Sequence, residues 1–100
     1  MSYRTEFLKK ARLELLEAWS WYEDKQPGLG DRFIKHIEAA IGSIELNPEY
    51  YKEKAKGYRQ ASVKIFPYLI IYKVHKRKKT VAIVSVFHTR RNPKKREKQN

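Results

Sequence analysis

The sequence predicts an α+β fold of the order β-α-α-β-β-β, in which a twisted antiparallel sheet packs against an N-terminal helical hairpin. The first reason is the run FPYLIIYKV at residues 66–74, the most apolar stretch of the chain. Its β-branched and aromatic residues favour a buried central strand, and Pro67 near its start disfavours a helix. The second reason is that apolar residues recur every three or four positions between residues 8 and 44, as on one face of a helix.

The spacing of the apolar residues in the N-terminal segment changes at residue 8. Residues 3–7 (YRTEF) alternate between apolar and polar side chains, which predicts a short strand that joins the edge of the sheet. A helical stripe follows, and the glycines and proline of residues 26–30 end it. The stripe of this first helix consists of Leu8, Ala11, Leu15, Ala18, Trp19 and Tyr22.

The second predicted helix has a clear end and a less sharply marked beginning. Asp31 is a suitable N-cap, although the helix could also begin a few residues earlier. Asn47 precedes Pro48, and a residue before proline is kept out of the helical region, so the helix ends there. Two amphipathic helices joined by a short turn form an antiparallel hairpin. The apolar stripe of the second helix is Phe33, Ile34, Ile37, Ala40, Ile41 and Ile44.

The second half of the chain is predicted to form a three-stranded antiparallel meander. Residues 49–57 are polar and contain two tyrosines, which indicates a loop or a frayed turn. The basic residues 76–79 are expected at the tip of the last hairpin. The three strands are expected at residues 58–65, 66–74 and 80–87.

Length and composition indicate one soluble domain. One hundred residues allow a single core, which we expect to span residues 1–93, followed by a disordered basic tail at 94–100. No run approaches the roughly 20 apolar residues that a membrane span needs, and no signal-peptide core opens the chain. These features, with the absence of cysteine, indicate a cytoplasmic protein without disulfides or a membrane partner. His36 and His75 lack the spacing of metal ligands, so no metal site is expected.

The formal net charge of +12 is concentrated in the second half of the chain. Residues 51–100 carry 16 Lys and Arg against 2 Asp and Glu, whereas residues 1–50 carry 7 against 9. A strongly basic C-terminal half, joined to an N-terminal half of nearly balanced charge, predicts a polyanionic partner. This partner would be nucleic acid, the ribosome or an acidic protein. The alternative is a basic surface that serves only solubility.

A series of short patterns runs along almost the whole chain. They are Ala11 with Glu14-Leu15, Trp21-Tyr22-Glu23, Gly28-Leu29-Gly30, Arg32-Phe33, Ile37, Ile44, Asn47-Pro48, Tyr58-Arg59, Phe66-Pro67-Tyr68, Ile71-Tyr72, and His88 with Arg91-Asn92-Pro93. In this order and spacing they resemble the toxins of the RelE/ParE superfamily from bacterial type II toxin–antitoxin (plasmid stabilization) modules. The fold of that family, a twisted antiparallel sheet packed by a helical hairpin, agrees with the fold that the periodicity predicts.

The resemblance implies a growth-inhibiting toxin that a cognate antitoxin holds inactive in a hetero-oligomer, without a cofactor. RelE-like members cut messenger RNA on the ribosome, whereas ParE-like members poison DNA gyrase and cleave no RNA. The ending of this chain, in which Arg91 follows His88 and no tyrosine follows Tyr72, looks closer to the ParE-like branch. We therefore expect gyrase poisoning. The alternatives are a metal-independent, ribosome-dependent mRNA endoribonuclease and an inactive member that only binds its antitoxin.

If the chain is a nuclease, three residues have suitable chemistry. Attack by a 2′-hydroxyl needs a base, an acid and cations that neutralise the charge on phosphorus. His88 suits proton transfer, and the guanidinium groups of Arg59 and Arg91 suit two-point contact with phosphate. The structural alternatives are that His88 is an ordinary strand-end histidine and that Arg59 holds the sheet edge or pairs with Glu53.

A second set of residues is predicted to bind the antitoxin or the target. Trp19 and Trp21 lie about 200° apart around a helix. Trp19 fits the core stripe, so Trp21 should be partly exposed and serve as an interface anchor. Tyrosines could stack on a base, although Tyr72, inside the central strand, fits the core. The predicted binding residues are Trp21, Tyr22, Tyr58, Tyr68, Arg90, Lys76 and Arg77.

Overall fold

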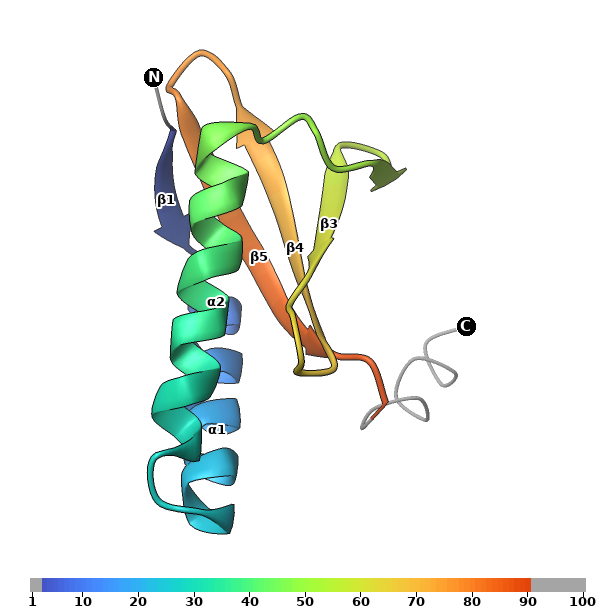
Figure 1. Ribbon diagram of the computed structural model, residues 1–100. Coiled ribbons are helices and arrows are strands. Elements are labelled where there is room, and N and C mark those ends of the chain that lie inside the picture. The colour runs from blue at the N-terminus through green and yellow to red at the C-terminus, as the bar shows by residue number, and fades with distance from the viewer. Residues whose placement is uncertain (1–2, 91–100) are drawn as a thin grey trace.

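The computed structural model describes residues 3–90 and has two layers, a helical hairpin and a five-stranded sheet (Figure 1). The strand order across the sheet is β1-β5-β4-β3-β2, so β4 is central, as predicted. Within the described residues, no helix combines the length and apolarity that a membrane span needs. The elements are β1 (Arg4–Phe7), α1 (Lys9–Lys25), α2 (Leu29–Leu46), β2 (Glu53–Ala55), β3 (Tyr58–Ser62), β4 (Tyr68–His75) and β5 (Thr80–His88).

β1 joins the edge of the sheet, as predicted, but it runs parallel to β5, so the sheet is mixed rather than wholly antiparallel. The reason is the number of passes that the chain makes. The two helices carry the chain out and back, and α2 ends beside the start of β1, where the Tyr3 N–H donates to the Glu45 carbonyl oxygen (3.0 Å). β3 therefore starts at the same end of the sheet as β1. Two antiparallel reversals then give β5 that direction again.

The segment predicted as a loop, residues 49–57, contains an additional short strand. β2 pairs antiparallel with β3 around a turn at Gly57, whose φ of 77° is in the left-handed region that glycine adopts easily. The Gly57 N–H donates to the carboxylate of Glu53 (3.0 Å) and closes the turn. Strand pairing here depends on this turn and not on apolar alternation, which the segment lacks.

β3 is shorter than predicted. It ends at Ser62 rather than at residue 65, because Ile65 has a φ of 74°, a conformation that cannot continue a strand. The chain turns there, and Ile65 is 77% exposed. β4 begins at Tyr68, so Phe66 and Pro67 belong to the loop between the two strands.

The two helices meet at a junction held by one carboxylate. Gly28, with a φ of 91°, lies immediately before α2. The N–H groups of Gly28 and Gly30 each donate to an oxygen of Glu23 (2.8 Å), which satisfies two backbone donors at the start of α2. Because α2 starts earlier than Asp31, that residue is not its N-cap. Asp31 instead accepts a hydrogen bond from the indole N–H of Trp19 (3.0 Å).

The core lies between the hairpin and the sheet and is centred on aromatic rings. The ring of Phe33 lies 5.0–5.2 Å from those of Tyr22, Phe66 and Tyr68. Leu8, which the periodicity assigned to the helical stripe, precedes α1 and is 46% exposed. The buried cluster consists of Ala11, Ala18, Tyr22, Phe33, Ile37, Ile44, Ala61, Val63, Phe66, Tyr68, Ile70, Tyr72, Val81, Ile83 and Val86.

Beyond the end of β1, the outer edge of β5 is covered by α1. β1 pairs with β5 only as far as Ile83. Farther along β5, Oε1 of Glu14 accepts hydrogen bonds from the Val86 backbone N–H (2.9 Å) and the Ser85 hydroxyl (2.8 Å). Lys10 donates to the other oxygen of Glu14 (2.9 Å). A helix side chain thus replaces the missing strand partner.

Candidate functional site

The end of β5 places His88 next to an aromatic ring of the core. His88 pairs with Tyr68 across β4 and β5, and the two rings meet edge to face with centroids 4.9 Å apart. Nδ1 of His88 accepts a hydrogen bond from the backbone N–H of Arg90 (3.0 Å). The neutral ring therefore carries its proton on Nε2. His88 is half-buried, and its neighbours fix the orientation of its ring.

Trp21 lies on the surface of α1, next to this aromatic group. It is 41% exposed, its ring meets that of Tyr22 edge to face (5.2 Å), and the ammonium group of Lys25 is 4.6 Å from its centroid. The predicted exposure of Trp21 is confirmed, and its role as an interface anchor stays a prediction. Tyr22 and Tyr68 lie in the core, so they support this surface from beneath.

Arg59 lies on β3, where it ties down the segment that precedes β2. Its Nη1 donates to the carbonyl oxygens of Tyr51 (2.6 Å) and Glu49 (3.4 Å), and its Nη2 is 3.8 Å from a carboxylate oxygen of Glu53. These contacts match the structural alternative, in which Arg59 pairs with Glu53 and holds the sheet edge. Both terminal nitrogens of the guanidinium group therefore contact other residues of the fold.

Tyr72, opposite Arg59 in the register, is fully buried. Its hydroxyl donates to the carbonyl oxygen of Pro48 (2.7 Å), which anchors the chain just after α2. Burial raises the pKa of Tyr72 to about 12. Tyr72 therefore has a structural role in the core.

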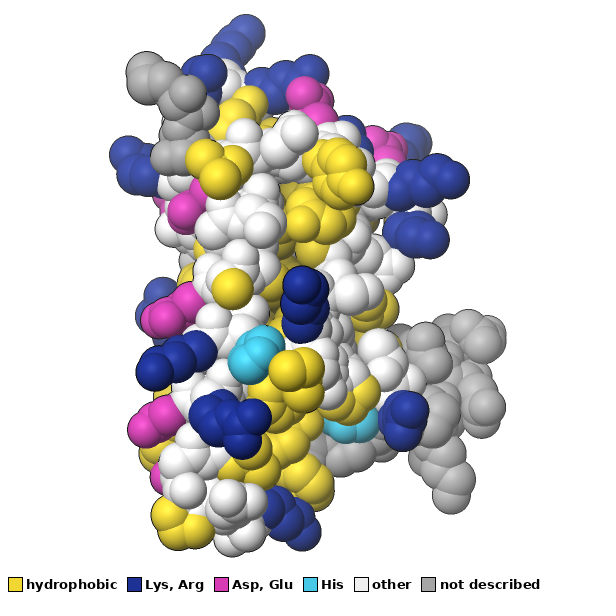
Figure 2. Space-filling view, viewed as in Figure 1, with side chains coloured by type: hydrophobic (Ala, Val, Ile, Leu, Met, Phe, Trp, Pro, Cys, Tyr) yellow, Lys and Arg dark blue, Asp and Glu magenta, His cyan; other side chains and the backbone are white. Residues whose placement is uncertain are grey.

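Lys and Arg side chains crowd the end of the molecule that carries the β4–β5 turn (Figure 2). Residues 76–79 form that turn, as predicted, and all of them are exposed, Arg77 included. Lys76 pairs with Glu49 (2.9 Å). This hydrogen bond lowers the pKa of Glu49 and raises that of Lys76. An open depression of about 460 Å³ lies here, lined by Glu49, Glu53, Gly57, Arg59, Val74 and Lys76.

Tyr58 lies on the neighbouring strand, close to this basic end. It is half-buried, and the ammonium group of Lys73 is 5.0 Å from its ring centroid. A lysine already lies over the ring that the sequence suggested for stacking on a base.

The structure separates the two groups that a nuclease would need together. Arg59 is opposite Tyr72 and His88 is opposite Tyr68, so they lie four residues apart along β4, or roughly 13 Å. They also flank β4 on opposite sides, which adds two strand spacings, or about 10 Å. One phosphate cannot contact both side chains in this arrangement. Arg91 and the tail at 94–100 lie outside the described residues.

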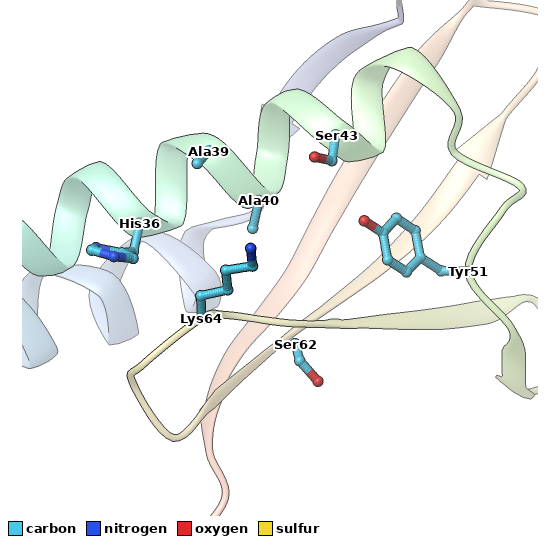
Figure 3. Close-up of a pocket in the computed structure, with 7 residues that line it drawn as sticks. All are labelled: His36, Ala39, Ala40, Ser43, Tyr51, Ser62 and Lys64. Atoms are coloured by element: carbon cyan, nitrogen blue, oxygen red, sulfur yellow. The ribbon is translucent and has the colours of Figure 1, made fainter.

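A pocket that the sequence did not indicate lies between α2 and β3 (Figure 3). Its volume is about 230 Å³. The side chain of Lys64 extends toward α2, and the hydroxyl of Tyr51 points toward Ser43. In the sequence, only the adjacent small residues Ala39 and Ala40 indicate that this face of α2 leaves room for a pocket. The lining residues are His36, Ala39, Ala40, Ser43, Tyr51, Ser62 and Lys64, none of which is acidic.

In residues 3–90, no group of three or more His, Cys, Asp or Glu side chains is arranged to hold a metal ion.

The family model described as the ParE toxin of the type II toxin–antitoxin system parDE matches residues 5–93. A search of curated proteins gave no match.

Solved structures share the fold. The chromosomal ParDE toxin–antitoxin system from P. aeruginosa matches with a TM-score of 0.74 and 13% identity, over 87% of this chain and 96% of that chain. The isolated E. coli RelE toxin matches with a TM-score of 0.65 and 19% identity, over 98% and 96%. The RelBE2 toxin–antitoxin complex from Mycobacterium tuberculosis matches with a TM-score of 0.62 and 20% identity, over 88% and 99%.

Proposed function

The chain belongs to the ParE toxin family of type II toxin–antitoxin systems, and on this premise we propose that it inhibits growth by poisoning DNA gyrase in the cytoplasm. A cognate antitoxin holds it inactive. The action is inhibition through protein contact, so it requires no set of catalytic groups.

The observation that carries this proposal is the position of Arg59. Three contacts within the fold occupy its guanidinium group, and the strand register places it far from His88. Metal-independent RNA cleavage needs a proton-transfer group and a cation at one phosphate. The separation of Arg59 and His88 therefore favours a non-enzymatic inhibitor.

The pocket between α2 and β3 is the surface that we assign to the antitoxin. β2 pairs only with Tyr58 and Arg59, so in the described chain the outer edge of β3 has no strand partner from Gln60 onward. Such an edge can accept an extended segment through backbone hydrogen bonds. The pocket contains Lys64 and no acidic residue, so an acidic segment would meet no repulsion from its walls.

The alternative, a ribosome-dependent mRNA endoribonuclease, is favoured by the basic turn. Residues 76–79 are four exposed cations, and such a group suits the phosphate backbone of ribosomal RNA. In that case His88 would exchange the proton, and a cation other than Arg59 would have to neutralise the phosphate.

Short induction of the chain in cells without the antitoxin, with separate labelling of DNA and protein synthesis, tests the proposal. DNA synthesis should fail first, with SOS induction and filamentous cells, and the purified chain should trap cleaved DNA on gyrase. Prompt arrest of translation with cleaved transcripts would replace the proposal with the nuclease alternative. No arrest would reduce the chain to an antitoxin-binding member. A Phe33→Asp variant, which places a charge in the core, controls for the load of expression.

A further inference from the structure

The outer face of α1 carries an apolar seam that nothing in the described chain covers. Leu13 and Leu16 are 55% and 57% exposed, and they point away from the buried side of the helix, which carries Ala11 and Ala18. Lys9 and Ser20, both exposed, extend the same line. From Lys9 through the two leucines to Ser20, the positions are four, three and four residues apart, which is the spacing along one seam between two packed helices.

The exposed cations of α1 are concentrated in its first turn. The exposed cations Lys9, Lys10 and Arg12 lie in the first turn, which contains no acidic residue. The exposed acidic residue Glu17 lies at the middle of the helix and Asp24 in its last turn, where the exposed cation Lys25 follows it. Cations at a helix N-terminus oppose the macrodipole, so the three cations of the first turn do not stabilise α1 through its dipole. Their position, with Glu17 farther along the helix, suits a neighbouring helix that runs in the opposite direction.

We propose that this seam binds the α1 helix of a second copy of the chain, antiparallel, about a two-fold axis. Leu13 of each copy packs on Leu16 of the other. Lys10 and Glu17 flank the seam on the same side. In this register Lys10 of one copy, whose ammonium group also pairs with Glu14 of its own helix (2.9 Å), lies close to Glu17 of the other. The surface is self-complementary, as a two-fold interface requires.

The charge order favours a second copy over a partner of one charge sign. An acidic segment would be repelled by Glu17 and Asp24, and a basic one by the cations of the first turn. The seam lies on the far side of α1 from the core, whereas the pocket assigned to the antitoxin lies between α2 and β3. The dimer therefore does not rest on the proposed function, although Trp21, the predicted antitoxin anchor, lies next to Ser20 at the end of the seam. With two leucines in each copy, the interface belongs to the small, weakly associating class.

A mixed cross-linking experiment tests the pairing and its direction. The chain contains no cysteine, so one full-length variant carries Leu13→Cys and another carries Leu16→Cys, both made by cell-free synthesis. In an oxidised equimolar mixture, the antiparallel register predicts that the disulfide between the two different variants exceeds its statistical share. Predominance of the two same-variant products would overturn the antiparallel register. Both positions are exposed, so neither substitution alters the core.

Sedimentation of the cysteine-free chain over a range of concentrations provides the second readout. The proposal predicts a monomer–dimer equilibrium that Leu16→Glu abolishes and that Glu17→Lys weakens. Leu46 at the end of α2 is 76% exposed and lies outside the seam, so Leu46→Glu is the matched control and should dimerise like the parent chain. A monomer at every concentration, or equal loss of the dimer in the Leu46→Glu variant, would overturn the proposal.

Discussion

The carboxylate of Glu14 on α1 accepts the backbone N–H of Val86 on β5 at 2.9 Å, although the two residues lie 72 positions apart. This contact lies where β1 no longer covers the edge of β5. A sheet edge normally exposes such N–H groups for pairing with another chain. Here a helix side chain occupies one of them, so α1 packs on the sheet and also protects its edge.

Glu14→Ala should lower the free energy of unfolding by about 1.5–3 kcal/mol, because the Val86 N–H loses a charged acceptor in a partly buried position. Glu14→Gln keeps an acceptor and should cost less. Urea unfolding measures both. Glu38→Ala, at an exposed position on α2 outside the proposed seam, is the control. An equal loss in that variant would show that Glu14 acts only through helix propensity.

Gly30→Ala should destabilise the fold by about 1–3 kcal/mol through overpacking. A Cβ at this position would lie 2.6 Å from the backbone oxygen of Trp19 and 2.7 Å from Oε1 of Glu23, so the two helices would have to separate. Gly42 is the matched control, because a Cβ there meets nothing within 4 Å. Gly42→Ala should stabilise by about 0.5–1 kcal/mol. Thermal unfolding of the two variants should therefore give shifts of opposite sign.

Tyr72 should make stability depend on alkaline pH. Its pKa is raised to about 12 in the folded chain from about 10 in the unfolded chain. Because the folded state favours the protonated phenol, this stability is fully present below pH 10 and is lost as pH rises from about 10 to 12. Tyr72→Phe should cost about 1 kcal/mol at neutral pH, since the bond to Pro48 is lost. The difference in unfolding free energy between the two chains should shrink across that pH range, and a constant difference would contradict the assignment.

Arg59→Ala should loosen residues 49–55, because the guanidinium group holds the backbone of that segment. Hydrogen exchange should rise there and stay unchanged in β4 and β5. Arg77→Ala, at the exposed turn, is the control. If Arg59→Ala instead abolished transcript cleavage and left hydrogen exchange unaltered, Arg59 would be catalytic.

Trp21→Ala should weaken antitoxin binding by about 2 kcal/mol or more, as loss of a partly exposed tryptophan anchor does at many interfaces. Calorimetry or surface binding with the cognate antitoxin measures the change. Tyr50 is 75% exposed on a different part of the surface, so Tyr50→Ala serves for comparison. Unchanged affinity of the Trp21 variant would remove Trp21 from the interface.

The helices and the central strand could be predicted because their apolar periods are set by burial against a single core. Ala18 and Tyr22 face that core from α1, as their spacing requires. β2 could not be predicted in the same way, since it is exposed on both faces and depends on the turn at Gly57. The end of β3 depends on one backbone angle at Ile65, to which hydrophobic patterning is insensitive.

The candidate site was less predictable than the fold. Arg59 and His88 had suitable chemistry, but only the strand register shows that they lie four residues apart along β4 and on opposite sides of it. The burial of Tyr68 follows from alternation along β4, which could have been read from the sequence. The pocket beside α2 could not, because it depends on how far β3 extends and on the placement of Lys64.

The parallel pairing of β1 with β5 also bears on when the chain can fold during its synthesis. Residues 4–7 are made well before their partners, residues 80–83, which leave the ribosome only after the helices and the other strands. Contacts between such distant segments form late and slowly. A nascent chain interrupted before β5 would lack both the partner of β1 and the strand beside β4. The sheet can therefore form only after β5 has been made, so termination before residue 80 would release no folded toxin.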